Sequence, residues 1–407
     1  MRTRRLSFYY AGAVLALSCQ AAAAPPAPAQ AGPTLKHAFE AAWSRAPAAR
    51  TLEGRQDETA AARDQARSWI AANPTLGLSH RADTGTLDRD GRESEVSLAS
   101  SIWLPGQKAA RETLAVRSTE EVDAQLGATR LAVAGLVRNR LWEAAAARVR
   151  LEEKQDHLHH LEGFADEVAR RVKAGDLARS DGLLAQQEVL AARIDVDAAR
   201  TAAFEALARY RVVTGLAELP PLEPEPLAAS APADPRLAAA QASEQRARAA
   251  LRLAEANRAS PPTLALSMRQ EDERLLREPI RSIGLALQVP FGSVARNRGA
   301  EAQARTAIAT AAAEAAELQA TAAADIEVAH QRLANARNGL DTARARAAAL
   351  HEHTALLEKA FGLGERGLAE VLRSRALTHE ADVALAQQQV ALGLAHALFN
   401  QASGILP

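Results

Sequence analysis

The stretch "NPTLGLS" (residues 73–79) returns almost unchanged as "PPTLALS" (residues 261–267), 188 positions further along the chain. Such a repeat decides the fold, because a doubled unit is built twice from the same elements. More pairs recur at offsets of 188 or 189 residues: Pro47 with Pro235, Gly175 with Gly364, Asp181 with Glu370, and Gly215 with Gly404. The sequence therefore predicts two tandem copies, residues 35–215 and 235–404, joined by a Pro-rich linker at 216–234.

The composition is typical of long, closely packed helices. Aromatic residues make up only 3% of the chain, and alanine is scattered among Glu, Gln, Arg and Leu. The 49 basic and 49 acidic residues balance, so no overall field favours a nucleic-acid partner. No nucleophile elbow, P-loop, HExxH or CxxC motif occurs. We therefore expect neither an enzyme nor a bound cofactor.

The N-terminus has the pattern of a secretory signal peptide over residues 1–23. Three arginines precede the apolar stretch from Phe8 to Ser18, and the small residues 21–23 offer a cleavage site. Cys19 is the only cysteine, so no intrachain disulfide can form. Its position after Leu17-Ser18 is also typical of a lipoprotein signal that ends in a lipidated cysteine. Two interpretations stay open: lipidation at Cys19, and an incidental cysteine in a discarded peptide.

Each copy has the same predicted order of elements. A first helix (35–71, then 235–258) ends before a proline, and two segments follow in which apolar and small polar residues alternate, as in strands. Charged loops at 82–94 and 269–279 separate these strands. Long helices then run over 107–171 and 293–363, break at Gly175 and Gly364, and continue to Gly215 and Gly404. About 65 helical residues span roughly 100 Å.

This doubled order, with "AGDLARSDGLLAQQ" (174–187) and "LGERGLAEVLRSR" (363–375), resembles the TolC family of outer-membrane efflux proteins over essentially the whole mature chain. The region "NPTLGLS…LPGQKAARETLA" (73–115) looks most like the heavy-metal (cobalt–zinc–cadmium) branch. The resemblance implies a mainly helical protomer with a small β part. It also implies a homotrimer that shares a 12-stranded transmembrane β-barrel, sits in outer-membrane lipid, and extends a coiled-coil tunnel into the periplasm.

Membrane physics agrees with that architecture. An open sheet edge leaves unsatisfied amides in lipid, and four strands are too few to close a barrel, whereas three chains supply twelve. The alternating leucines and valines would face lipid, and their Ser, Gly and Thr neighbours the pore. The alternative is a soluble hairpin with one buried face. Aromatic girdles usually mark both membrane interfaces, and here only Trp69, Trp103 and Phe291 lie near the expected boundary.

Asp181 and Glu370 each follow the helix-breaking glycine of their copy by six residues. The resemblance implies that these carboxylates ring the periplasmic mouth of the tunnel as a gate. Arg366 matches a basic gate position, and Arg373 stands where the family has a second acidic residue, so it could pair with Glu370. The alternative is a set of solvated helix charges. The resemblance also implies that the helix tips contact a periplasmic adaptor protein, which links them to an inner-membrane RND-type pump. The predicted contact residues are Arg171, Leu177, Arg179, Ser180 and Leu368.

Histidines gather at His157, His159 and His160, and again at His351 and His353, at similar predicted heights on the tunnel wall. Imidazole suits zinc, copper, cobalt and nickel, but residues two apart do not share a helix face. We therefore expect exposed helix histidines rather than a metal site, with His157, His160, His351 and His353 as the weak candidates.

The sequence favours a passive outer-membrane duct of a tripartite efflux system that exports divalent heavy-metal cations. Alternatives are a type I secretion outlet, a multidrug efflux channel, and an exported coiled-coil scaffold without a barrel. Fold alone does not separate the metal-efflux duct, the type I secretion outlet and the multidrug channel, because the same architecture serves all three.

Overall fold

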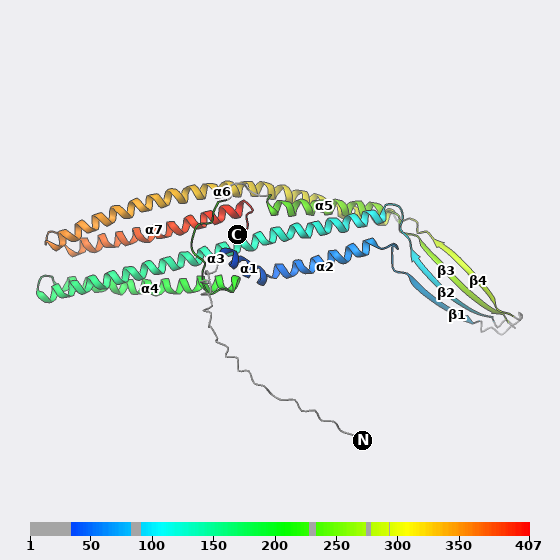
Figure 1. The fold of residues 1–407 in the computed structure, drawn as a ribbon, viewed down its shortest axis with the longest axis horizontal. Coiled ribbons are helices and arrows are strands. Elements are labelled where there is room, and N and C mark those ends of the chain that lie inside the picture. Colours follow the sequence, from blue (N-terminus) through cyan, green and yellow to red (C-terminus); the bar gives the residue numbers. More distant parts are fainter. Residues whose placement is uncertain (1–33, 83–90, 228–232, 274–277, 293) are drawn as a thin grey trace, which may run out of the picture.

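The computed structural model describes residues 34–82, 91–227, 233–273, 278–292 and 294–407. The predicted signal peptide, including Cys19, lies outside the described residues, as do the central parts of both charged loops. A long bundle of helices carries a small sheet at one end (Figure 1). The chain is thus mainly helical with a small β part, as predicted.

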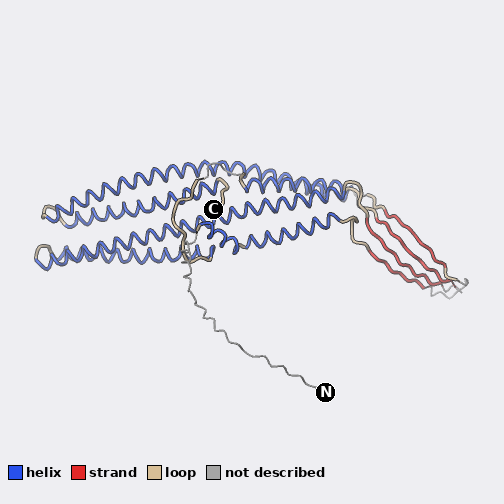
Figure 2. The backbone as a smooth tube through the Cα atoms, in the orientation of Figure 1, coloured by secondary structure: helices blue, strands red, loops and turns tan. Residues whose placement is uncertain are grey.

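After a short first helix, α1 (Leu35–Arg45), the same order of elements occurs twice. The first series is α2 (Pro47–Arg67), β1 (Thr75–Ala82), β2 (Gly91–Ser101), α3 (Gln107–Ala174) and α4 (Arg179–Thr214). The second is α5 (Pro235–Ala256), β3 (Thr263–Glu273), β4 (Ile280–Gln288), α6 (Val294–Gly362) and α7 (Leu368–Ala402). The long helices α3 and α6 run from the sheet to the opposite end of the molecule, where each turns back into its shorter partner (Figure 2).

The single first helix that we predicted over 35–71 is wrong, because the structure divides it at Ala46 and ends it at Arg67. Proline disfavours helical backbone at the residue before it, and Ala46 has an extended ψ of 126°. Pro47 then opens α2 at a position where its missing amide proton costs nothing. The break lets α1 pack Ala38 and Ala42 against α3 and α4.

Glycine closes both hairpin tips. Gly175 and Gly364 have φ values of 89° and 79°, in the left-handed region that other residues rarely adopt. The Gly175 amide donates to the last turn of α3, and the Gly364 amide donates to that of α6. This shared requirement explains why both copies carry glycine at the same place.

The four strands form one antiparallel sheet in the order β1-β2-β3-β4. Its register aligns apolar residues across all four strands in two rows: Leu76, Leu98, Leu266 and Leu285, then Leu78, Val96, Met268 and Ile283. Since neighbouring residues point to opposite faces of a sheet, both rows lie on the same face. Between them, on the other face, runs a row of small residues: Gly77, Ser97, Ser267 and Gly284.

The buried core of the helical part lies in separate clusters along its length. One joins α1, α3 and α4 through Val137, Leu141 and Tyr210. A second joins α3 to α7 through Trp142, Ala145, Val390 and Ala397. A third, here named the tip cluster, contains Phe164, Val168, Phe361, Leu368 and Val371. The two copies are therefore held together both near the middle of the bundle and at its far end.

Candidate functional site

The apolar face of the sheet is exposed to its surroundings. The side chains of Leu78, Ile283 and Leu285 are 73–75% exposed, although leucine and isoleucine are normally buried. The apolar series continues toward the helices through Leu287, Val289 and Phe291. A contiguous apolar surface of this kind marks contact with another protein or with lipid.

Aromatic side chains lie where the helices meet the sheet. Trp69 and Phe291 are 82% and 96% exposed. Trp103 makes specific contacts: its indole nitrogen donates to the Ser68 carbonyl oxygen at 3.0 Å, and Arg111 lies over its ring. These are the three aromatic residues that the sequence placed at the boundary.

The linker crosses the bundle and is tied to both copies by hydrogen bonds around one buried ion pair. Arg138 of α3 is fully buried, and its guanidinium donates to both carboxylate oxygens of Glu225 at 2.9 and 2.6 Å. It also donates to Gln401 Oε1 and to the Ile405 carbonyl oxygen. From α7, the Asn400 amide donates to the Glu225 carboxylate. We name Arg138, Glu225, His396, Asn400 and Gln401 the linker clasp.

No sequence pattern points to the linker clasp, because its members are 87 or more positions apart except within α7. His396 completes it by hydrogen bonding through Nδ1 to the Glu225 carbonyl oxygen at 2.9 Å. Each of the three guanidinium nitrogens of Arg138 donates to at least one acceptor, which helps to compensate its buried charge.

The predicted gate carboxylates occupy equivalent places, each in the first turn of the helix that leaves a tip. The carboxylate of Asp181 accepts the backbone N–H of Ala178 at 3.2 Å and so caps α4. Glu370 pairs with Arg366 at 3.4 Å, with both side chains about half exposed. Among the described residues of the tip, no ion pair joins Glu370 to Arg373. Glu370 therefore pairs with Arg366 and not with Arg373, the partner suggested from the sequence.

The predicted adaptor-contact residues differ in their surroundings. Arg179 and Ser180 are exposed, and Leu177 is half-buried against the tip cluster. Arg171 pairs with Glu167 and lies over the Phe361 ring, 5.1 Å from its centre. Leu368 is only 5% exposed, so it contributes to the tip from within rather than by presenting its own surface.

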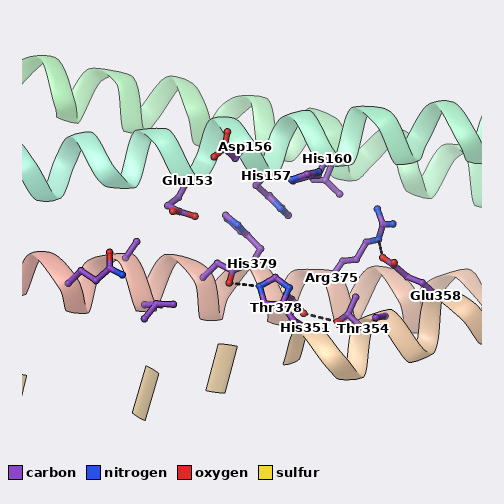
Figure 3. Close-up of a pocket in the computed structure, with 16 residues that line it drawn as sticks. Glu153, Asp156, His157, His160, His351, Thr354, Glu358, Arg375, Thr378 and His379 are labelled. Atoms are coloured by element: carbon purple, nitrogen blue, oxygen red, sulfur yellow. Dashed lines mark hydrogen bonds and ion pairs between the residues drawn. The ribbon is translucent and has the colours of Figure 1, made fainter. Parts of the chain in front are cut away.

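A cavity of about 670 Å³ lies between α3, α6 and α7, and histidines from all three helices line it. Figure 3 shows His157 and His379 reaching toward each other across it, and their rings stack with centroids 3.7 Å apart and an 8° tilt. The partner of His157 is therefore His379, which the sequence analysis did not single out. His351 instead pairs with Asp382 at 2.8 Å, and His353 bonds to Ser374.

Burial is the largest cause of the shifted pKa values among the side chains that line this cavity. It lowers the pKa of His157 and of His379 to about 4, with Lys154 adding to the effect on both rings. It also raises the pKa of Glu153, with further contributions from Asp382, Asp156 and Glu152. Among the described residues, no group of three or more His, Cys, Asp or Glu side chains is arranged to hold a metal ion.

None of the helices in the described ranges has the length and hydropathy that a membrane span requires.

No protein-family model matches the chain, and no curated protein sequence matches it significantly. Solved structures do match its fold. The outer membrane protein VceC from Vibrio cholerae superposes with a TM-score of 0.73 at 14% identity, covering 91% of this chain and 96% of that one. CusC, described in terms of transmembrane channel formation, gives 0.75 at 13%, with 91% and 92% covered. The open state of the Neisseria gonorrhoeae MtrE outer membrane channel gives 0.71 at 15%, with 92% and 89% covered. The chain thus has the fold of the TolC-like outer membrane channels.

Proposed function

We propose that the chain is one of three protomers of a duct that crosses the outer membrane and extends into the periplasm. The observation that carries this proposal is the sheet, which has an exposed apolar face and unpaired edges at β1 and β4. An open edge is not tolerated in lipid, so the sheet has to close on further strands. Three copies give twelve strands, and the row of small residues would then line the pore.

The dimensions fit a membrane span. The apolar residues of β4 and its continuation run from Ile283 to Phe291. Residues 283–291 are nine positions, and a tilted transmembrane strand takes about 9–11 residues. The exposed Trp69 and Phe291 lie at the helical end of this band, where aromatic residues commonly mark a membrane interface.

The flanks of the helical part support a ring of identical copies. Strand β1 with α2 and α4 lies along one flank, and β4 with α6 along the other (Figure 1). On α4, five large apolar residues are more than half exposed and fall within one stripe of the helix about 80° wide: Leu183, Leu190, Ile194, Phe204 and Val212. If one flank meets the opposite flank of the next copy, the contact is heterologous and closes after three. An exported scaffold without a barrel leaves these apolar surfaces unexplained.

We further propose that the duct is the outer-membrane component of a tripartite efflux system. The exposed Arg179 and Ser180 at the tips would meet a periplasmic adaptor, and an inner-membrane pump would drive transport. The descriptions of CusC and MtrE name a channel, and that of VceC an outer membrane protein; the likeness in fold supports a channel role here. The resemblance to the heavy-metal branch makes divalent transition-metal cations the proposed cargo, passing as substrate rather than held at a resident site.

Topology is the sharpest test of the duct. A cysteine in place of the exposed Arg92, at the far end of β2, should react with a membrane-impermeant maleimide in intact cells. The matched variant Ser180→Cys, at a hairpin tip, should react only after the outer membrane is permeabilised. The unaltered chain controls for Cys19. Labelling of Ser180→Cys in intact cells, or of neither variant, would overturn the topology, and a monomer in native mass spectrometry would overturn the trimer.

Cargo is tested separately. Deletion of the gene should lower tolerance to zinc, cobalt or cadmium more than tolerance to lipophilic drugs. The opposite ranking would move the proposal to a multidrug channel while leaving the duct in place.

A further inference from the structure

Between the linker clasp and the tip cluster, one polar contact joins the two copies. His157 of α3 and His379 of α7 stack at 3.7 Å. On the side toward the sheet, Trp142 and Ala145 pack against Val390. On the side toward the tips, Phe164 and Val168 pack against Val371. The imidazole stack therefore lies inside a cavity that separates two apolar seams.

Protonation of the two rings would weaken this contact, because neither ring is hydrogen-bonded among the described residues to an acceptor that would favour its charged form. His379 Nε2 is buried and makes no hydrogen bond among the described residues. The two rings face each other at a distance at which two positive charges would repel strongly. A stack of neutral rings is favourable, and the same stack doubly charged is not.

The charged groups facing the pair are mostly committed to other partners. Lys154 of α3 pairs with Asp195 of α4 at 2.7 Å. From α6 and α7, Glu358 pairs with Arg375 at 2.6 Å, and His351 pairs with Asp382.

Three groups of α3 remain near the pair: Glu153, Asp156 and His160. The raised pKa of Glu153 means that its carboxylate takes up a proton earlier than usual as the solution becomes acidic. His160 can only add positive charge when it is protonated. Acid thus removes the negative charge of Glu153 from the cavity as well as adding positive charge to the rings.

We propose that the His157–His379 pair is an acid-sensitive latch, which holds the α3/α4 hairpin against the α6/α7 hairpin at neutral pH and releases it when the rings become charged. The sign follows from linkage. The packed rings have pKa values of about 4, below the usual 6.5, so they bind fewer protons than separated rings do. The latch is at full strength above about pH 6.5 and weakens as the pH falls toward 4. If the chain is the proposed duct, the latch lies in its periplasmic helical part and would respond to the pH of the periplasm.

The experiment measures the distance between the hairpins and does not depend on transport. Gln155 of α3 and Ala376 of α7 are exposed near the latch and can be replaced with cysteines that carry nitroxide labels. Labelled chains are diluted with unlabelled chains, and the distance distribution is recorded by double electron–electron resonance at pH 7.5 and pH 4. We expect one population at pH 7.5 and a second, longer one holding more than half of the molecules at pH 4, reversibly and with unchanged helical circular dichroism.

The variant His157→Phe with His379→Phe keeps an aromatic stack and removes both protons, so its distribution should not respond to pH. If this variant fails to fold, His379→Gln alone should at least halve the response. His330→Phe is the control, because His330 of α6 contacts Phe399 of α7 within the same hairpin, away from the cavity, and the change should leave the response intact. An unchanged distribution in the native chain overturns the latch. An equal response in the Phe pair also overturns it, because the carboxylates would then be responsible.

Discussion

The linker clasp and the hairpin tips join the same two copies by opposite means. At the clasp, a fully buried guanidinium meets a carboxylate that is itself nearly buried, and three further side chains add hydrogen bonds. At the tips, the Arg366–Glu370 pair is about half exposed to solvent. Arg375 and Arg171 lie over the rings of Phe164 and Phe361, with their side chains 27% and 33% exposed.

The difference in burial sets how easily each region can rearrange. Breaking a buried ion pair leaves an uncompensated charge and costs about 3–5 kcal/mol, whereas an exposed pair contributes about 0–1 kcal/mol. The clasp should therefore act as the fixed point of the helical part, and the tips as the region that moves at low cost. This division suits a duct whose β-barrel has to keep its strands joined while its periplasmic end opens.

The largest effect should come from Arg138→Met, because Glu225 and Asn400 would keep their places without the guanidinium. We expect a loss of about 3–5 kcal/mol in the free energy of unfolding, measured by denaturant titration in detergent. Arg140→Met is the control on the same helix, since Arg140 forms an exposed pair with Glu143 and should cost about 0–1 kcal/mol. Equal losses in the two variants would remove the distinction between clasp and surface pairs.

A smaller loss is expected from Gly393→Ala, beside the clasp. A Cβ at Gly393 would lie 2.0 Å from Trp142 Cη2, so the indole has to move, and overpacking of this kind costs about 1–3 kcal/mol. Trp142→Phe should reduce the cost of the alanine, and a double-mutant cycle would measure that coupling.

The tip offers the matched glycine. At Gly182 a Cβ would meet only Val172 Cγ2, at an ordinary 3.6 Å, so Gly182→Ala should stabilise α4 by about 0.5–1 kcal/mol. If both alanine variants have the same melting midpoint, packing at the clasp is no tighter than packing at the tip.

The features that the sequence predicted well are those with local causes. Alternation of apolar and small residues predicted all four strands, and the helix-breaking glycines predicted both tips, where the structure has positive φ. The long helix predicted over 293–363 is observed as Val294–Gly362. The break before Pro47 was missed because its benefit comes from packing against α3 and α4. Arg138 with Glu225, and His157 with His379, could not be predicted, since no local pattern records which distant side chains the fold brings together.

The smallest effect, and the most direct test of the tips as the mobile region, should come from Asp181→Asn combined with Glu370→Gln. Asparagine can still accept the Ala178 N–H, so the cap of α4 survives, while Glu370→Gln loses its ion pair with Arg366. The proposed trimer carries three copies, so a modest rise in open probability is expected from pairs worth about 0–1 kcal/mol each. Removing six carboxylates would also weaken the negative potential that concentrates cations at the mouth.

Single-channel recording in a planar bilayer should therefore show higher mean conductance together with a lower preference for cations. Glu205→Gln is the matched control, because its pair with Arg209 has the same i, i+4 spacing and similar exposure but lies toward the other end of α4. Conductance and selectivity should stay at their native values in that variant. If they also stay native in the double variant, Asp181 and Glu370 are ordinary surface charges. The contacts that control the tips would then be those of the tip cluster, where the guanidinium groups of Arg171 and Arg375 cover the Phe361 and Phe164 rings.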